Sequence, residues 1–371
     1  MAPLTGTRVL DFSALLPGAL ATLILSEAGA EVIKVERAGA GDEMRSREPR
    51  FGATSASFAM LNGGKRSIAV DLKNAADRDR LLPLIANVDV LVDSYRPGVM
   101  ERLGLGCDSV RRINPRIIYC ALTGYGQSGT KADLAGHDIN YLAQSGISSL
   151  VTGAGGVPPV PAAPFADIGG GTFPLVINIL LALMQREKTG KGCFLDVAIA
   201  DGMMSFCYTA LARGFSSSDW PAPDAQPLTG ALARYRHYRT RDNRFIAVGA
   251  LEEKFWSAFC DLIALPAESR DDRKTPDQSI RAVTEIMLSR DAAEWEQLFA
   301  GHDVCCTLVK TMEEAGSTVD ARYGVASGAQ TMPALPLPVA RHLRHEAGAR
   351  TPPALGEANA LLEEDACQRA S

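Results

Sequence analysis

The chain has 371 residues, of which 46% are hydrophobic and 22% are charged, and its formal net charge is −5. These values are typical of a globular protein with about two domains, and they exclude a disordered or fibrous chain. The chain has no long basic run, so it lacks the broad positive field of a nucleic-acid-binding protein. We therefore expect no nucleic-acid partner.

Eight cysteines are scattered along the chain without a CxxC pair, and no histidine stands at zinc-ligand spacing. This pattern argues against a bound metal and indicates reduced thiols and a cytoplasmic protein. The apolar stretch 168–184 is shorter than the ~20 residues of a membrane helix. Glycines and Asn178 also interrupt it, so we expect a buried core helix and no membrane partner.

The first part of the chain alternates between short apolar segments and helical patterns. Strands are expected at 8–11, 31–36, 68–71, 90–93 and 117–121, with helices at 17–28, 74–86 and 99–103. Such alternation predicts an α/β fold with an open, Rossmann-like sheet. The GxGxxG motif does not follow the first strand, which argues against a nicotinamide cofactor.

The second part of the chain predicts a smaller domain. A linker rich in Ser, Pro and Asp at 216–227 precedes a strand at 244–248 and a helix from 252 or 253 to 265. We therefore expect a large α/β domain over 1–215, a smaller α+β domain over 228–320, and a return to the large domain over 321–371.

Two residues stand where an open sheet would place its chemistry. His137 follows a strand and a glycine-containing turn, and the carboxyl ends of parallel strands are where such sheets bind ligands. It could act as a general base, or it could only cap the helix that begins near Asp138. Asp167 precedes three glycines, and it is either a plain helix cap or a carboxylate beside a wall that substrate can approach closely.

Four cations lie near successive strand ends. Lys65 and Arg66 follow a glycine turn, Arg37 closes one strand, and Arg96 follows another. Each alone is explained equally well as solvated surface. Together they indicate an anionic, elongated ligand with phosphate groups.

Several motifs, in order along most of the chain, resemble family III CoA-transferases. They include VLD at 9–11, EVIKVE at 31–36, GKRS at 64–67, YRPG at 95–98 and LTGYG at 122–126. Within that superfamily, GHDINY at 136–141 and VGALE at 248–252 resemble α-methylacyl-CoA racemases.

The resemblance implies an interlocked homodimer, with linkers near Ser216 and Tyr323 crossing between chains. CoA would lie on the large domain, and the partner's small domain would close the active site. The substrate would be an acyl-CoA thioester, with CoA as part of the substrate and no permanently bound cofactor or metal. The implied phosphate-binding residues are Arg37, Lys65, Arg66 and Arg96.

The implied reaction is inversion of C2 in a 2-methylacyl-CoA through an enolate, which needs a base on each face. His137 and Asp167 match the two bases, and Glu252 matches a supporting acid. Backbone amides at 169–171 could hold the enolate oxygen. Arg234 stands at an unusual place for the family and indicates a polar or carboxylated acyl group.

Two other functions remain open. A CoA-transferase would use Asp167 as a nucleophile, through an aspartyl-CoA thioester, and would leave His137 without a role. Ala163 weakens the racemase assignment more than the assignment of CoA as ligand, because racemases usually have Asn at this position. A non-catalytic CoA-binding protein would keep the cations, but the joint presence of His137, Asp167 and Glu252 argues against it.

Overall fold

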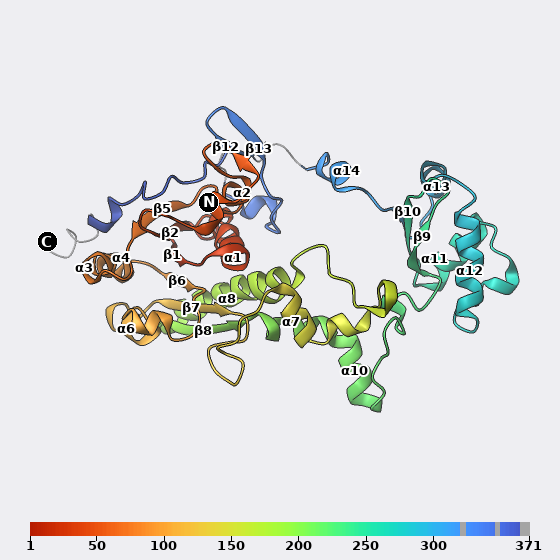
Figure 1. Cartoon of the computed structure of the whole chain (residues 1–371), viewed down its shortest axis with the longest axis horizontal. Helices are drawn as coiled ribbons and strands as arrows, with labels where there is room; N and C mark the ends of the chain where they lie inside the picture. The colour runs from red at the N-terminus through yellow and green to blue at the C-terminus, as the bar shows by residue number, and fades with distance from the viewer. Residues whose placement is uncertain (320–323, 346–348, 364–371) are drawn as a thin grey trace. The chain divides into compact units, whose positions relative to one another are not determined.

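The computed structural model describes residues 1–319, 324–345 and 349–363, and its internal contacts divide the chain into two units (Figure 1). The first unit comprises Met1–Ser145, Pro161–Phe206 and Val319–Ser371, and the second comprises Gly146–Val160 and Cys207–Thr318. Segments 146–160 and 207–215, expected in the large domain, thus belong to the second unit. The expected crossing near Tyr323 lies outside the described residues.

The first unit contains a six-stranded sheet in which every neighbouring pair of strands is parallel. Its strands are β1 (Arg8–Phe12), β2 (Glu31–Arg37), β5 (Arg66–Val70), β6 (Val90–Asp93), β7 (Ile118–Thr123) and β8 (Cys193–Ala198). Their order is β5-β2-β1-β6-β7-β8, so the winding direction reverses between β1 and β6. This is the doubly wound order, and it confirms the predicted parallel α/β sheet.

Helices cover both faces of this sheet because its strands alternate two sets of buried side chains. Leu10, Ile33 and Ile68 pack with α4 (Leu81–Ala86) and α6 (Cys107–Ile113). The opposite face packs against α1 (Leu15–Glu27) and α8 (Phe173–Thr189), and α2 (Ala56–Asn62) packs on α1. Ala358, Leu361 and Leu362 join the first of these cores, so the end of the described chain belongs to the large unit.

Helix α8 continues a π-helix, Ala166–Thr172, and together they are long and apolar enough to cross a membrane by length and composition. One face packs on β7 and β8. The other exposes a row of apolar side chains: Phe173, Ile177, Leu180, Leu181 and Met184. The expectation of a buried core helix is therefore wrong for this second face. Near the end of the helix, Arg186 is buried and pairs with Asp89 at 2.9 Å.

The second unit is a small α+β structure. Its antiparallel sheet has the order β11-β10-β9, with β9 (Tyr235–Arg239), β10 (Phe245–Gly249) and β11 (Cys306–Leu308). One face packs on α11 (Glu253–Leu262), α12 (Pro276–Met287) and α13 (Ala292–Phe299), with Trp256 and Trp295 at the centre of the core.

The remaining elements are short. They are β3 (Arg50–Phe51), β4 (Thr54–Ser55), β12 (Gly324–Ser327), β13 (Gln330–Pro333), α3 (Ala75–Asp79), α5 (Val99–Arg102), α7 (Asp138–Gln144), α9 (Ile199–Gly202), α10 (Tyr208–Ser217) and α14 (Met312–Gly316). Of these, α7 and α9 matter most for the site, because both contact the π-helix that carries Asp167.

Candidate active site

A hollow of about 360 Å³ opens at the carboxyl edge of the parallel sheet. The loops that follow β1, β6 and β7 form most of its wall, through Ala14–Leu15, Ser94–Pro97 and Leu122–Gly124. The winding direction reverses between β1 and β6, so the loops leave this edge in opposite directions and open a crevice there. Open α/β sheets bind their ligands at this place.

His137, Asp167 and Arg96 all line this hollow. His137 directly precedes α7, and its backbone N–H donates to Asn140 Oδ1 at 3.0 Å. The backbone of His137 thus serves the start of the helix, while its imidazole is exposed at the hollow. The structure therefore brings together two acid–base groups and a cation that are separated by up to 71 residues in the sequence.

Asp167 occupies the first turn of the π-helix and is partly buried. Burial raises the pKa of its carboxyl to about 6; the Asp138 carboxylate raises it further, and His137 opposes the shift. Asp138 Oδ1 also accepts the backbone N–H of Asp167 at 2.9 Å. A carboxyl group with a pKa near 6 can give and take a proton close to neutral pH, as general acid–base catalysis requires.

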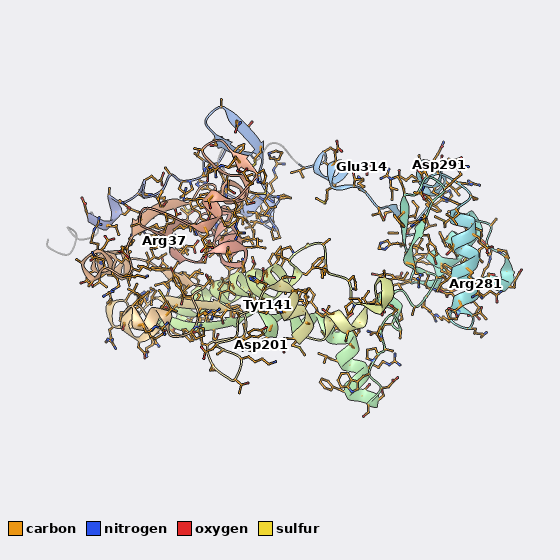
Figure 2. All side chains as sticks on the ribbon, viewed as in Figure 1. Arg37, Tyr141, Asp201, Arg281, Asp291 and Glu314 are labelled. Atoms are coloured by element: carbon orange, nitrogen blue, oxygen red, sulfur yellow. The ribbon has the colours of Figure 1, made fainter. Side chains whose placement is uncertain are left out.

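Tyr141 of α7, labelled in Figure 2, is one of the residues that line the hollow. Its hydroxyl donates to the Gly136 carbonyl at 2.7 Å. A Cβ at Gly124 would lie 2.6 Å from the Tyr141 ring, and one at Gly136 would lie 2.8 Å from it. Glycine at both positions therefore lets the ring pack against the loop that precedes His137.

The three glycines after Asp167 have a packing role. A Cβ at Gly170 would lie 2.3 Å from the Ile199 carbonyl oxygen of α9, and one at Gly171 would lie 3.1 Å from the Ile199 side chain. Both glycines are buried within the helix that begins at Ala166. The helix begins at Ala166, three residues before Gly169, and the expectation that these amides hold an enolate oxygen stays a prediction. Close approach of α9 explains the glycines.

Exposed cations follow the carboxyl ends of neighbouring strands. Arg37 closes β2 (Figure 2), and Arg96 follows β6. Lys73 follows the end of β5 and is also exposed. The sequence interpretation missed Lys73, although its position just after a predicted strand was the available signal. These three cations share the ligand-binding edge of the sheet, where an elongated polyanion can reach them.

Lys65 is not available to a ligand, contrary to expectation. Its ammonium group is fully buried, 3.4 Å from Asp11 Oδ2, and donates to Ala19 O, Thr22 Oγ1 and Asn62 Oδ1 at 2.8–2.9 Å. Burial lowers the pKa of Lys65 to about 8, with Asp11 opposing the shift. Lys65 thus belongs to the charged interior of the large unit.

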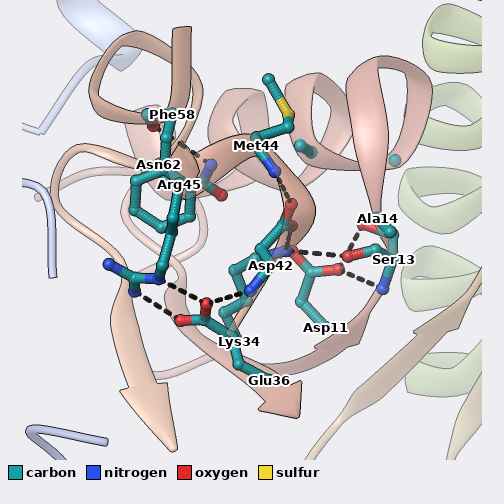
Figure 3. Close-up of polar contacts among 12 residues, drawn as sticks. Asp11, Ser13, Ala14, Lys34, Glu36, Asp42, Met44, Arg45, Phe58 and Asn62 are labelled. Carbon is teal, nitrogen blue, oxygen red and sulfur yellow. Dashed lines mark hydrogen bonds and ion pairs between the residues drawn. The ribbon is translucent and has the colours of Figure 1, made fainter. Parts of the chain in front are cut away.

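The same interior holds a second buried ion pair. Figure 3 shows Lys34 between Asp42 and Ser13, with a Lys34 Nζ–Asp42 Oδ2 distance of 2.8 Å. The Asp11 carboxylate accepts hydrogen bonds from the Ser13 and Thr22 hydroxyls. Burial opposes ionisation of Asp11, but Lys65, Lys34 and the two hydroxyl hydrogen bonds together outweigh it and lower the pKa of that carboxyl. Buried charges need such partners.

Arg66 also lies outside the expected phosphate-binding site. It begins β5 and pairs with Glu31, which begins β2, at 2.9 Å. Since β2 and β5 are parallel, both residues lie at the amino edge of the sheet. The ligand-binding edge is at the other ends of these strands, so the assignment of Arg66 to a phosphate at that edge is wrong.

Glu252 lies in the second unit, where it is exposed and directly precedes α11. Arg234 lies in the same unit but is 2% exposed. Its guanidinium pairs with Asp272 at 2.7 Å and with Glu253 at 3.0 Å. Arg234 therefore points into the unit, and it supplies no free charge to recognise a carboxylated acyl group.

The matching family model is CoA-transferase family III, over residues 4–359. The chain belongs to this family. Mouse α-methylacyl-CoA racemase is 36% identical over 320 residues, covering 84% of this chain and 79% of the racemase. Mouse succinyl-CoA:glutarate CoA-transferase is 32% identical over 373 residues, covering 96% and 85% of the two chains.

Solved structures agree with this placement. The crystal structure of Rv3272 from Mycobacterium tuberculosis is 28% identical, with a TM-score of 0.81 over 97% of this chain and 99% of that one. A CaiB/BaiF family protein from Brucella suis, 24% identical with a TM-score of 0.82, shows the same fold. The family is enzymatic, and its members that resemble this chain include both racemases and CoA-transferases.

Proposed function

We propose that the protein is a racemase that inverts C2 of 2-methylacyl-CoA thioesters by proton transfer through an enolate. One observation carries the proposal: His137 and Asp167 line the same hollow at the ligand-binding edge of the sheet. A racemase needs a base on each face of a planar enolate. A transferase that uses Asp167 as a nucleophile has no such use for His137.

The proton transfers follow from the chemistry of the thioester, because its carbonyl group acidifies the α-hydrogen. In one direction neutral His137 removes the proton from one face, and protonated Asp167 delivers a proton to the other. In the reverse direction the two groups exchange roles. A pKa of about 6 for Asp167 lets its carboxyl both accept and donate a proton near neutral pH, as the two directions of the reaction require.

The cations at the carboxyl edge support acyl-CoA as the substrate. Arg37, Lys73 and Arg96 each follow a strand that ends there, and guanidinium and ammonium groups bind phosphate oxygens well. CoA would then be held as part of the substrate, with no permanently bound cofactor. Among the described residues, no group of three His, Cys, Asp or Glu side chains could hold a metal ion.

A CoA-transferase is the second candidate, favoured by the similarity to succinyl-CoA:glutarate CoA-transferase over 96% of the chain. An Asp167 oxygen would attack the thioester carbonyl and expel CoA as a thiolate, leaving a mixed anhydride. The thiolate would then attack the Asp167 carbonyl, release the acid and form the aspartyl-CoA thioester.

Substitution of the two bases separates these reactions. For the racemase, His137→Ala and Asp167→Ala should each slow inversion by about 10²–10⁴-fold, because each base serves its own face. Hydroxylamine should trap no Asp167 adduct. A trapped adduct, together with near-normal turnover by His137→Ala, would contradict the racemase proposal and favour the CoA-transferase.

We also propose that the protein is an interlocked homodimer and that it is cytoplasmic. In this assembly Glu252 would act as the supporting acid of the active site. The exposed apolar face of α8 supports the proposal of a dimer, because a large exposed apolar patch usually marks a protein interface. On α10 and just beyond it, Phe215 and Trp220 are also exposed. Sedimentation should show a dimer at micromolar protein, and a stable, active monomer would contradict this assembly.

A further inference from the structure

Arg234 joins three separate segments of the second unit. It lies just before β9 and forms two-pronged hydrogen bonds with Asp272, from Nε at 3.0 Å and from Nη2 at 2.7 Å. Its Nη1 donates to the Leu251 carbonyl at 3.2 Å and to Glu253 Oε2 at 3.0 Å. The guanidinium carbon also lies 5.1 Å from the centre of the Trp256 ring.

These contacts hold the chain on both sides of Glu252. Leu251 precedes Glu252 and gives its carbonyl to Arg234, while Glu253 follows and gives its carboxylate. The carbonyl of Glu252 itself accepts the N–H groups of Phe255 and Trp256 at the start of α11. The backbone of Glu252 is thereby fixed, while its own carboxylate stays exposed.

A second hollow, of about 680 Å³, opens on the open face of the small sheet. Cys305 lines this hollow, and its carbonyl accepts the Gly249 N–H at 2.9 Å. Burial raises the pKa of the Cys305 thiol, and the Asp303 and Glu252 carboxylates raise it further. The Glu252 carboxylate is thus within electrostatic range of a thiol that lines the hollow.

We propose that Arg234 is a positioning residue that aims the Glu252 carboxylate by clamping Leu251 and Glu253. This inference rests on the proposed role of Glu252 as the supporting acid. Asp272 is fully buried and fixes the guanidinium plane, so the two N–H groups of Nη1 are held toward Leu251 and Glu253. Lysine cannot make all of these contacts, because its single ammonium group lacks the planar set of N–H donors that a guanidinium group has.

The test is a double-substitution cycle in the full-length protein, with turnover measured as α-hydrogen exchange of a 2-methylacyl-CoA in deuterium oxide. Arg234→Lys should lower kcat by up to about 100-fold, because a catalytic group is misplaced, and should leave KM little changed. In a Glu252→Gln background, Arg234→Lys should cause no further loss. Arg241→Met is the matched control, since Arg241 pairs with Asp291 and Glu294 in the same unit, and it should leave kcat unchanged.

A second variant guards against misfolding of Arg234→Lys. Glu253→Ala removes only the exposed arm of the clamp, a side chain that is 75% exposed, so the unit should fold normally. It should lower kcat in the wild-type background and not in Glu252→Gln. Equal losses in both backgrounds, or no loss in the wild type, would overturn the positioning role. If Glu252→Gln itself keeps full turnover, the proposed role of Glu252 fails instead.

Discussion

The side chain of Asp138 accepts the backbone N–H of Asp167 at 2.9 Å, so two acidic residues are tied together at the candidate site. The contact joins the start of α7 to the π-helix and places like charges near each other. The Asp138 charge adds to burial in raising the pKa of Asp167 to about 6. The residue next to His137 thus helps to hold the second base in place and adds to the shift of its pKa.

Asp138→Asn should separate these two effects. The amide oxygen can still accept the Asp167 N–H, but the charge is lost, so the pKa of Asp167 should fall. In the direction in which Asp167 removes the proton, the acid limb of the pH–kcat profile should then move below about pH 6. Asp138→Ala also loses the hydrogen bond, and we expect kcat to fall by up to about 100-fold. An unmoved acid limb in Asp138→Asn would contradict the electrostatic coupling.

Asp167→Asn should stabilise the protein above neutral pH. The pKa of Asp167 is raised in the folded state, so ionisation opposes folding. This penalty is absent below about pH 4, grows as pH rises towards 6, and is constant above that. After allowance for solvent screening of a partly exposed group, the gain should be about 1 kcal/mol at pH 8. Thermal melts at pH 4 and pH 8 measure it, and an equal gain at both values would point to another cause.

CoA affinity should depend on the carboxyl-edge cations. Arg96→Ala should weaken CoA binding about tenfold, because a charge-assisted hydrogen bond to phosphate is lost. The wild-type affinity should also fall as salt rises. Arg66→Ala is the control, since Arg66 lies at the amino edge beside Glu31, and it should bind CoA like the wild type. Calorimetric titration would contradict this site if the two variants lost affinity equally.

Lys65→Met should destabilise the large unit without acting through a phosphate contact. The substitution leaves the fully buried Asp11 without one of its two cations, which typically costs about 3 kcal/mol. Denaturant unfolding measures the loss. Asp11→Asn in the same chain should recover part of it, because the uncompensated charge is then removed. A stable Lys65→Met protein with much weaker CoA binding would restore the original phosphate assignment.

Much of the large unit could be predicted from its sequence pattern. The apolar run at 90–92 becomes most of β6, because parallel strands are buried on both faces and read as hydrophobic segments. The segment 31–36 becomes β2 although it carries the buried charges Lys34 and Glu36. The pattern at 74–86 was one expected helix, and the structure divides it into α3 and α4 at Arg80. Strand order could not be read from the sequence, since pairing depends on contacts between distant segments.

The candidate site was predictable in part for the same reason. His137 and Asp167 could be proposed from their places after a strand and before a helix, but only the fold shows that they share a hollow. The errors at Lys65 and Arg66 have one cause. Lys65 precedes β5 and Arg66 begins it, and the direction of a strand decides at which edge of the sheet its first residues lie. Arg234 was misjudged because its partner Asp272 lies 38 residues away.

Deuterium incorporation tests the central claim most directly. The wild-type protein is incubated with one enantiomer of a 2-methylacyl-CoA in deuterium oxide, with and without a free carboxylic acid, and the products are examined by mass spectrometry and chiral analysis. The account predicts deuterium at C2, appearance of the opposite enantiomer, and no dependence on the acid. Transfer of CoA to the free acid without deuterium at C2 would contradict it.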